Sequence, residues 1–231
     1  MISVFTSSHN HGEFLAAAIE SVIAQTFEDF EYLIYDDGSD DDTLSVIAHY
    51  AGRDSLRIRP FKLSKQPNVG VVVNRSLRDA KGSAWVWCPA DDILLPELLE
   101  RKAELADLYP DAVIYSHGSL MDEGGKVHGK VTPPSWTPEE FREVIQDTCP
   151  IGLTGLWVPM SVFDRVGGFP EHLPYSEDFY WMLKACRKGV DFRCVPQILY
   201  QKRKHRNSLT GRHQKEIVAN IARIREEVMN G

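Results

Sequence analysis

Three pairs of adjacent carboxylates could do chemistry in this sequence. They are Asp36–Asp37, Asp91–Asp92 and Glu177–Asp178. The second pair follows an apolar run, Trp85–Cys88, at the exposed end of a predicted buried strand, where two like charges repel unless a cation lies between them and a ligand. Carboxylate oxygens are hard donors that suit Mg²⁺ or Mn²⁺. The pattern therefore predicts a divalent metal that bridges the protein to a phosphorylated ligand.

Each pair also has a purely structural interpretation. The first pair precedes Gly38 and is compatible with an Asx-type turn. The second pair could cap a helix that begins near Pro96. In the third pair, Ser176 could serve as the cap and the two carboxylates would face the positive end of the helix dipole. No single pair decides between structure and function.

Alternating strands and helices must position these residues. Apolar runs predict strands over Ile2–Ser7, Glu31–Tyr35, the "LRIRPFKL" segment and the run that begins at Trp85. Helical spacing predicts helices between them, over Phe14–Gln25, in "DDDTLSVIAHYA" and in "VVVNRSLRDAKG", which Gly82 would end as a C′ residue. Another helix is expected from Pro96 to about Tyr109. This alternation predicts an α/β fold with a Rossmann-like, mostly parallel sheet flanked by helices on both faces.

The second half of the chain alternates less regularly. After a strand at "AVIYSHG", we expect a hairpin or loop, a short helix with Thr137 as its cap, and a strand, turn and short helix in "TGLWVPMSVFDRVGGF". A helix that ends at Gly189, a closing strand and an amphipathic tail follow. Because no linker or repeat is visible, we expect a single domain over residues 1–231. We expect three parts in it: residues 1–110, residues 111–210 and a C-terminal helix over 211–231.

Composition narrows the function further. The 231 residues carry a net charge of −7, which argues against a general nucleic-acid-binding protein. The four cysteines have no metal-ligand spacing, and the first residues lack a signal-peptide pattern, so we expect a cytoplasmic protein. A glycine-rich phosphate-binding loop and a G-K-[ST] motif are both missing. Phosphates would therefore need a bridging metal.

The order of the motifs resembles that of family 2 glycosyltransferases, which are inverting enzymes of the GT-A type. The matching segments are "VFTSSHNHG", "QTFEDFE", "DDGSDDDT", "NVG…NRSLRDAKGSAWVWCPADD", "VGGFPEHLPYSEDFYWMLKACRKG" and "LYQKRKHRNSL". They cover most of the chain from Ile2 to Thr210. The stretch from about Gly118 to Pro150 and the tail have no counterpart.

The resemblance implies roles for nine residues. Ser7, Ser8 and His9 would meet the nucleotide, and Asp37 would accept a hydrogen bond from a uracil-type N3–H. Asp91 would bind the divalent metal, Mn²⁺ or Mg²⁺, on the donor diphosphate, with Asp92 and His205 as further metal candidates. Asp178 would be the general base, with Glu177 beside it. The resemblance also implies that residues 1–110 are the nucleotide-binding half of the domain and residues 111–210 its acceptor and catalytic half.

Three departures from the family pattern concern the donor site. Pro89 replaces the first aspartate of the D-x-D motif, His9 replaces a usual tyrosine, and the loop after "NVG" is about two residues short. Basic residues after the closing strand are a solvated surface, or they attract phosphates or an anionic membrane face. They are Lys202, Arg203, Lys204, Arg206 and Arg212.

We therefore predict a metal-dependent inverting glycosyltransferase of the hexosyltransferase type. It would move a sugar from a UDP- or dTDP-sugar to a hydroxyl of a saccharide or lipid-linked saccharide, in the cytoplasm or in peripheral contact with the inner face of the membrane. Nucleic acid is not an expected partner. Two alternatives remain: a catalytically inactive nucleotide- or glycan-binding module, which Pro89 favours, and a sugar nucleotidyltransferase, which the "SSHNHG" loop disfavours.

Overall fold

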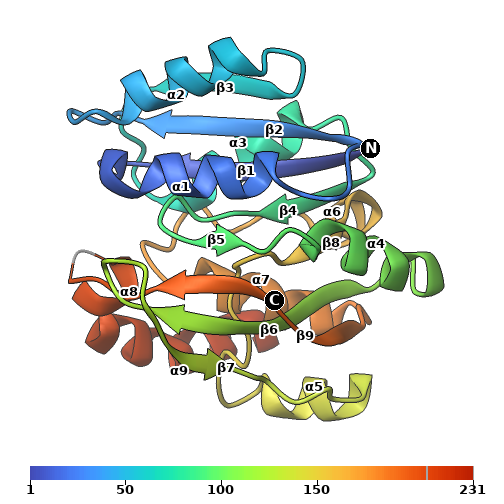
Figure 1. Ribbon diagram of the computed structural model, residues 1–231. Coiled ribbons are helices and arrows are strands. Elements are labelled where there is room, and N and C mark those ends of the chain that lie inside the picture. The colour runs from blue at the N-terminus through green and yellow to red at the C-terminus, as the bar shows by residue number, and fades with distance from the viewer. Residues whose placement is uncertain (207, 231) are drawn as a thin grey trace.

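The chain folds around one nine-stranded mixed sheet, seen in the computed structural model, which describes residues 1–206 and 208–230 (Figure 1). The strand order is β3-β2-β1-β4-β8-β6-β9-β5, with β7 paired to β6. The strands are β1 (Ile2–Ser8), β2 (Phe30–Asp37), β3 (Ile58–Leu63), β4 (Ala84–Trp87), β5 (Ile93–Leu94), β6 (Val113–Met121), β7 (Val127–Val131), β8 (Trp157–Pro159) and β9 (Phe192–Arg203).

The first half of the sheet is parallel. β1 pairs with β2 and β4, and β2 pairs with β3, all in the same direction. Each connection contains a helix: α1 (Gly12–Ile23), α2 (Thr43–Arg53) and α3 (Val69–Asp79). Parallel pairing of this kind places all four carboxyl ends at one edge of the sheet.

The second half is mixed. β8 runs antiparallel to β4 and β6, whereas β9 runs parallel to β6 and brings β5 into the sheet. β6 and β7 form a hairpin, so of the two expected forms for this stretch the hairpin is correct. The helices in this half are α4 (Leu98–Leu108), α5 (Pro138–Val144), α6 (Met160–Val166), α7 (Glu177–Arg187), α8 (Leu209–Arg212) and α9 (Gln214–Asn230).

Helices cover both faces of the sheet, so its strands are buried on both sides (Figure 1). Neighbouring residues of one strand therefore point into different cores: Val4 packs with Leu15 and Leu98, under α1 and α4. Phe5 packs in the opposite cluster, which the tail helix also enters through Ile224. This confirms the predicted α/β class and the apolar stripe of the tail.

Several predicted helix ends are confirmed and others are wrong. Thr137 caps α5 with a full capping box, and Gly189 follows α7 with a φ of +73°. In contrast, α3 ends with Ala80 as its C-cap, and Gly82 is needed because a Cβ there would lie 2.5 Å from the Ser3 nitrogen. The helix expected from Pro96 begins at Leu98 instead.

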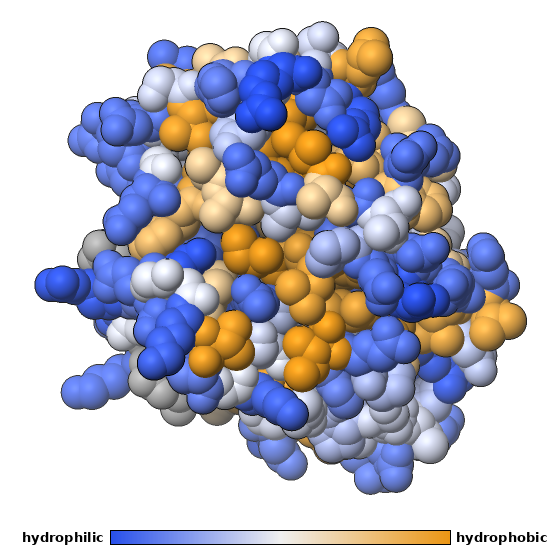
Figure 2. All heavy atoms as spheres, viewed as in Figure 1, coloured by the Kyte–Doolittle hydropathy of each residue, from blue (hydrophilic) through white to orange (hydrophobic). Residues whose placement is uncertain are grey.

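Hydrophilic side chains line the edge where the strands of the first half end, at the left of the space-filling view (Figure 2). Among the described residues, no helix combines the length and the apolar character needed to cross a membrane.

Candidate functional site

The polar residues singled out in the sequence gather at the carboxyl edge of the sheet. β1 ends at Ser8 and β2 at Asp37, and the loop after β4 carries Asp91. β9 ends at Arg203 and leads to His205, 114 positions after Asp91 yet in contact with it. Open α/β sheets bind ligands at this edge, because loops and helix starts converge there.

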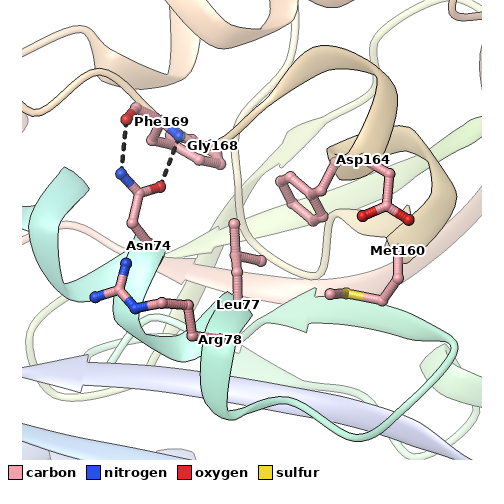
Figure 3. A pocket seen from close by; sticks show the side chains of 8 residues that line it. Asn74, Leu77, Arg78, Met160, Asp164, Gly168 and Phe169 are labelled. Atoms are coloured by element: carbon pink, nitrogen blue, oxygen red, sulfur yellow. Dashed lines mark hydrogen bonds between the residues drawn. The ribbon is translucent and has the colours of Figure 1, made fainter.

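An open cavity of about 390 Å³ lies elsewhere, between α3 and α6 (Figure 3). Its lining includes Leu77, Met160 and Asp164, and Asn74 closes one side by accepting a hydrogen bond from the Phe169 nitrogen at 2.8 Å. Met160 follows β8, whose last residue pairs with the first residue of β4. The cavity therefore opens near the amino end of β4, away from the carboxylates, and we assign it no chemistry.

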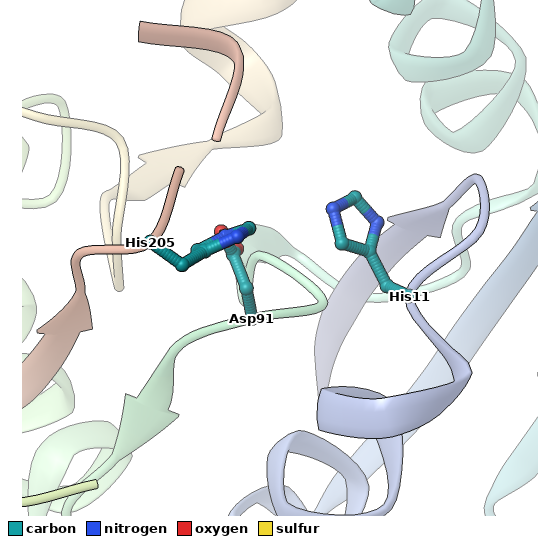
Figure 4. Close-up of side chains that lie close together, drawn as sticks. All are labelled: His11, Asp91 and His205. Carbon is teal, nitrogen blue, oxygen red and sulfur yellow. The ribbon is translucent and has the colours of Figure 1, made fainter. Parts of the chain in front are cut away.

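Asp91, His205 and His11 form a compact polar cluster at the carboxyl edge (Figure 4). His205 Nε2 lies 3.0 Å from Asp91 Oδ2. The His11 ring points toward this pair from the loop between β1 and α1, and one donor atom from each residue lies within 4.8 Å of the other two. One carboxylate and two imidazoles are a donor set for a divalent metal, so the residues fit the ion that the sequence predicts.

Hydrogen bonds fix the loop that carries His11. Asn10 has a φ of +58°, and its side chain accepts from the Asp40 nitrogen at 2.9 Å. The Gly12 nitrogen donates to Asp41 at 2.9 Å. Burial lowers the pKa of His11 below its ordinary value, although the Asp91 carboxylate acts in the opposite direction. At neutral pH this imidazole is therefore uncharged and able to bind a metal.

Arg203 holds the Asp91 loop in place. Its Nε donates to the Asp91 carbonyl at 2.9 Å, and its guanidinium also donates to the Glu123 carbonyl at 2.8 Å, in the β6–β7 turn. The same group lies over the ring of Phe14 in α1, 4.8 Å from its centre. Arg203 is buried, so the alternative that it belongs to a solvated basic surface is wrong, whereas its attraction for phosphates stays a prediction. Its neighbour Lys204 is exposed, as expected.

Among the described residues, Asp92 is not a member of the cluster of Asp91, His205 and His11, and its role as a metal ligand stays a prediction. Its two oxygens accept from Thr154 Oγ1 at 2.6 Å and from the Arg203 nitrogen at 2.8 Å. Burial and the neighbouring charge of Asp91 raise its pKa to about 7. The alternative that Asp92 caps α4 is also wrong, because the N-cap residue of that helix is Glu97. Asp92 instead ties β9 and the Thr154 loop to the site.

Glu177 and Asp178 open α7 in a strained backbone. Ser176 adopts a left-handed conformation with a φ of +66°, and its side chain makes no cap bond, so the prediction of a Ser176 cap is wrong. Strain of this kind is found at functional sites. Burial and the Asp178 charge raise the pKa of Glu177 to about 8, so Glu177 is protonated at neutral pH. Burial also raises the pKa of Asp178, which makes it a stronger base than an exposed aspartate.

The predicted nucleotide residues differ in how their polar atoms are used. Asp37 is buried and accepts from Lys65 Nζ at 2.6 Å and from the Gln66 nitrogen at 2.7 Å. A carboxylate has about four lone-pair sites, so Asp37 can still accept a base N–H. Ser7 and His9 are half-buried.

Unpaired buried polar atoms concentrate at this edge. Within the described part of the chain they include Ser8 Oγ, His9 Nδ1 and Asp36 Oδ2. Asp36 Oδ1 accepts from the Ser39 nitrogen at 3.1 Å, which confirms the Asx-type turn for that residue and leaves the other oxygen unused. Buried polar atoms are usually paired, so these unpaired ones favour a polar ligand at the ends of β1 and β2.

Sequence reasoning therefore located Asp91 and His205 in one cluster but missed His11 and Arg203. His11 had no motif to distinguish it from a surface histidine. Arg203 was hidden in a run of basic residues, and only its place at the end of a strand could have indicated burial.

Known proteins that are similar to the chain identify its family. The family model "Glycosyl transferase family 2" matches residues 3–166. An uncharacterised glycosyltransferase of Rickettsia felis is 27% identical over 194 residues, which are 81% of this chain and 31% of that protein. The chain thus spans about a third of the length of that relative.

Two solved structures have the same fold. Staphylococcus aureus TarS 1–349 in complex with UDP-GlcNAc has a TM-score of 0.73 at 20% identity, over 98% of this chain and 72% of that one. Mannosyltransferase PcManGT from Pyrobaculum calidifontis, in complex with GDP-Man and Mn²⁺, has a TM-score of 0.71 at 16% identity, over 100% and 64%. The chain has a GT-A fold and belongs to glycosyltransferase family 2.

Proposed function

We propose that residues 1–231 act as one metal-dependent inverting glycosyltransferase domain. The domain moves a sugar from a UDP- or dTDP-sugar to a hydroxyl of a saccharide or lipid-linked saccharide. The observation that carries this proposal is the 3.0 Å contact between Asp91 and His205, two residues from distant segments that converge at the ligand-binding edge of the sheet.

Asp91 and His205 would hold the divalent metal. Such an ion acts as a Lewis acid that neutralises the charge developing on a leaving diphosphate. The protein fixes the ligands: Arg203 holds the Asp91 main chain, and the Arg203 main chain is held in turn by Asp92. The Mn²⁺ in the structure of the mannosyltransferase PcManGT, which has a similar fold, supports this part of the proposal.

Asp178 would remove the proton from the acceptor hydroxyl. Glu177, protonated at neutral pH, adds no second negative charge beside it, so Asp178 is the ionised member of the pair. A single in-line attack by the acceptor oxygen inverts the anomeric carbon. A positioned base of this kind contributes ~10²–10⁴-fold to the rate.

The nucleotide would lie over the ends of β1 and β2, where Ser8 and Asp36 have unpaired buried atoms. Asp37 would accept the N3–H of a uracil or thymine base. The UDP-GlcNAc bound in the TarS structure supports a uridine donor, and the GDP-Man of the mannosyltransferase shows that this fold also admits a purine.

The exposed basic residues Lys204 and Arg206 would bring the domain to an anionic membrane surface when the acceptor is lipid-linked. Each charge near such a surface contributes about 1 kcal/mol. Binding to phosphatidylglycerol vesicles should weaken when both residues are changed to glutamine, and unchanged binding would contradict this part.

The test of the proposed reaction is Asp178→Asn, an isosteric change that removes the base. We expect transfer from a panel of UDP- and dTDP-sugars to saccharide acceptors to fall ~10²–10⁴-fold while the affinity for UDP stays at the wild-type value. Asp164→Asn, an exposed residue of the cavity at the other edge, serves as the matched control. Wild-type transfer rates in Asp178→Asn would remove Asp178 as the base.

The non-catalytic alternative is favoured by Pro89, which supplies no carboxylate at the start of the metal loop. Calorimetry with UDP and Mn²⁺, followed by a donor-hydrolysis assay, distinguishes an active glycosyltransferase from a non-catalytic binding module. Binding without transfer or hydrolysis for every donor tested would favour a binding module.

A further inference from the structure

We infer that His11 is a third protein ligand of the metal, so that two imidazoles and one carboxylate make the site select Mn²⁺ over Mg²⁺. This inference rests on the proposed function and adds a ligand and a metal preference to it. His11 lies in the segment "VFTSSHNHG", but the family resemblance implies no role for it, and the predicted metal ligands came from other segments.

The geometry brings His11 to the metal cluster from the opposite side. Its ring lies edge-on to that of His205, with the centres 6.2 Å apart and the planes at 85° (Figure 4). Two donors bound to one ion at about 2.1 Å lie at most about 4.2 Å apart. Neighbouring donors of an octahedral ion lie about 3.0 Å apart, as His205 Nε2 and Asp91 Oδ2 already do, so His11, whose donor atom lies within 4.8 Å of both, has to move closer by at most about 1.8 Å to complete the set.

The surrounding contacts hold His11 in this position. Its main-chain nitrogen donates to Thr43 Oγ1 at 3.3 Å, and the flanking residues Asn10 and Gly12 are bonded to the loop after β2. His205 packs against the ring of Phe14, at 4.9 Å, so the β1–α1 segment supports both imidazoles. Preorganised donors lower the cost of binding an ion.

The donor set also compensates for two missing carboxylates. Pro89 offers no side-chain oxygen, and both oxygens of Asp92 already accept hydrogen bonds, from Thr154 and from the Arg203 nitrogen. Asp91 is then the single carboxylate of the cluster. Mg²⁺ is held by carboxylate, phosphate and water oxygens and imidazole is not among its usual ligands, so two imidazole donors disfavour Mg²⁺ relative to a first-row transition metal such as Mn²⁺. Three protein ligands leave room in an octahedral shell for phosphate oxygens and water.

The test measures metal binding directly. Wild type, His11→Ala and His11→Asp are titrated with Mn²⁺ and with Mg²⁺ in the presence of UDP, with His49→Ala as control, because His49 is exposed on α2. We expect His11→Ala to weaken Mn²⁺ binding by about tenfold or more, and His11→Asp to shift the Mn²⁺/Mg²⁺ preference toward Mg²⁺. His49→Ala should match wild type.

Electron spin echo spectroscopy of bound Mn²⁺ gives the second readout. Modulation from two ¹⁴N nuclei is expected in wild type and from one in His11→Ala. Circular dichroism establishes that both His11 variants are folded. Unchanged Mn²⁺ affinity and an unchanged ¹⁴N signal in His11→Ala would overturn this inference alone, whereas a wild type that binds no metal with UDP would overturn the proposed metal dependence as well.

Discussion

The two halves of the sheet contribute to the site in different ways. In the parallel half, each polar residue follows its own strand, and atoms such as Ser8 Oγ and Asp36 Oδ2 are buried without a partner. In the mixed half, Ser116 Oγ and His205 Nδ1 are also buried without a partner, but the Arg203 nitrogen donates to Asp92 in the β4–β5 loop, and the Arg203 guanidinium bonds the β6–β7 turn. At the site, the ends of β1 and β2 therefore offer unpaired groups to a ligand, whereas Arg203 and Asp92 fasten the loop that carries the metal carboxylate.

The difference follows from topology. Parallel strands joined by short helical connections place their ends together without further contacts. β9, in contrast, reaches the site from the far part of the chain and must be fastened there by contacts such as that between the Arg203 nitrogen and Asp92, 111 positions apart. Substitutions in the first half should therefore change ligand binding, and substitutions in the second half should change stability as well.

The largest effect is expected for Asp91→Asn. This change removes the carboxylate charge beside which His11, from the first half, and His205, from the second half, both lie. A Lewis-acid metal contributes several kcal/mol, so transfer should fall by at least ~10³-fold. The free energy of unfolding should change little, because the carboxylate is partly exposed and its one side-chain hydrogen-bond partner among the described residues is His205. Transfer assays and urea denaturation check both parts. A large loss of stability would show that Asp91 stabilises the fold in addition to binding the ligand.

Arg203→Met tests whether Arg203 fastens the loop that carries Asp91. It leaves the carbonyls of Asp91 and Glu123 without their donor and should lower the free energy of unfolding by about 3 kcal/mol. Lys204→Met, the exposed neighbour, should change it by less than about 0.5 kcal/mol. Equal urea midpoints for the two variants would show that Arg203 does not fasten β9.

Glu177→Gln tests how much stability the protein loses by burying Glu177 beside the candidate base Asp178. The pKa of Glu177 rises from 4.5 to about 8 on folding, so the folded state binds more protons between these values. The stability of wild type should therefore fall as pH rises from about 5 to 8. Glu177→Gln lacks this loss and should gain about 3 kcal/mol relative to wild type over that range. Urea denaturation at both pH values measures it, and parallel pH profiles would contradict a buried, protonated Glu177.

The smallest effect is expected for Asp37→Asn in the parallel half. Loss of one charged hydrogen-bond acceptor should weaken UDP binding about tenfold and leave Mn²⁺ affinity unchanged. Asp40→Asn, an exposed residue of the same loop, is the control. If Asp37→Asn binds UDP as tightly as Asp40→Asn does, the base is not read by Asp37.

Much of the parallel half could be predicted because its signals are local. Apolar runs of four to eight residues mark β1, β2 and β4, and the carboxylates that follow them end at the predicted edge. The order of motifs also located Asp91 and His205. What could not be predicted depends on contacts across the chain: Asp92 turns inward only because Thr154 and β9 meet it there, and Arg203 is buried only because the β6–β7 turn and Phe14 close over it. The spacing of residues along the sequence does not indicate which distant residues will be in contact.

The central claim is that a divalent ion at Asp91 and His205 holds the donor diphosphate. Anomalous diffraction at the manganese edge, from crystals grown with UDP and Mn²⁺, tests it most directly. The account predicts one anomalous peak about 2.0–2.3 Å from an Asp91 oxygen and a His205 nitrogen, in contact with both phosphates. Bound UDP with no peak at these residues, or a peak in another part of the molecule, would contradict it.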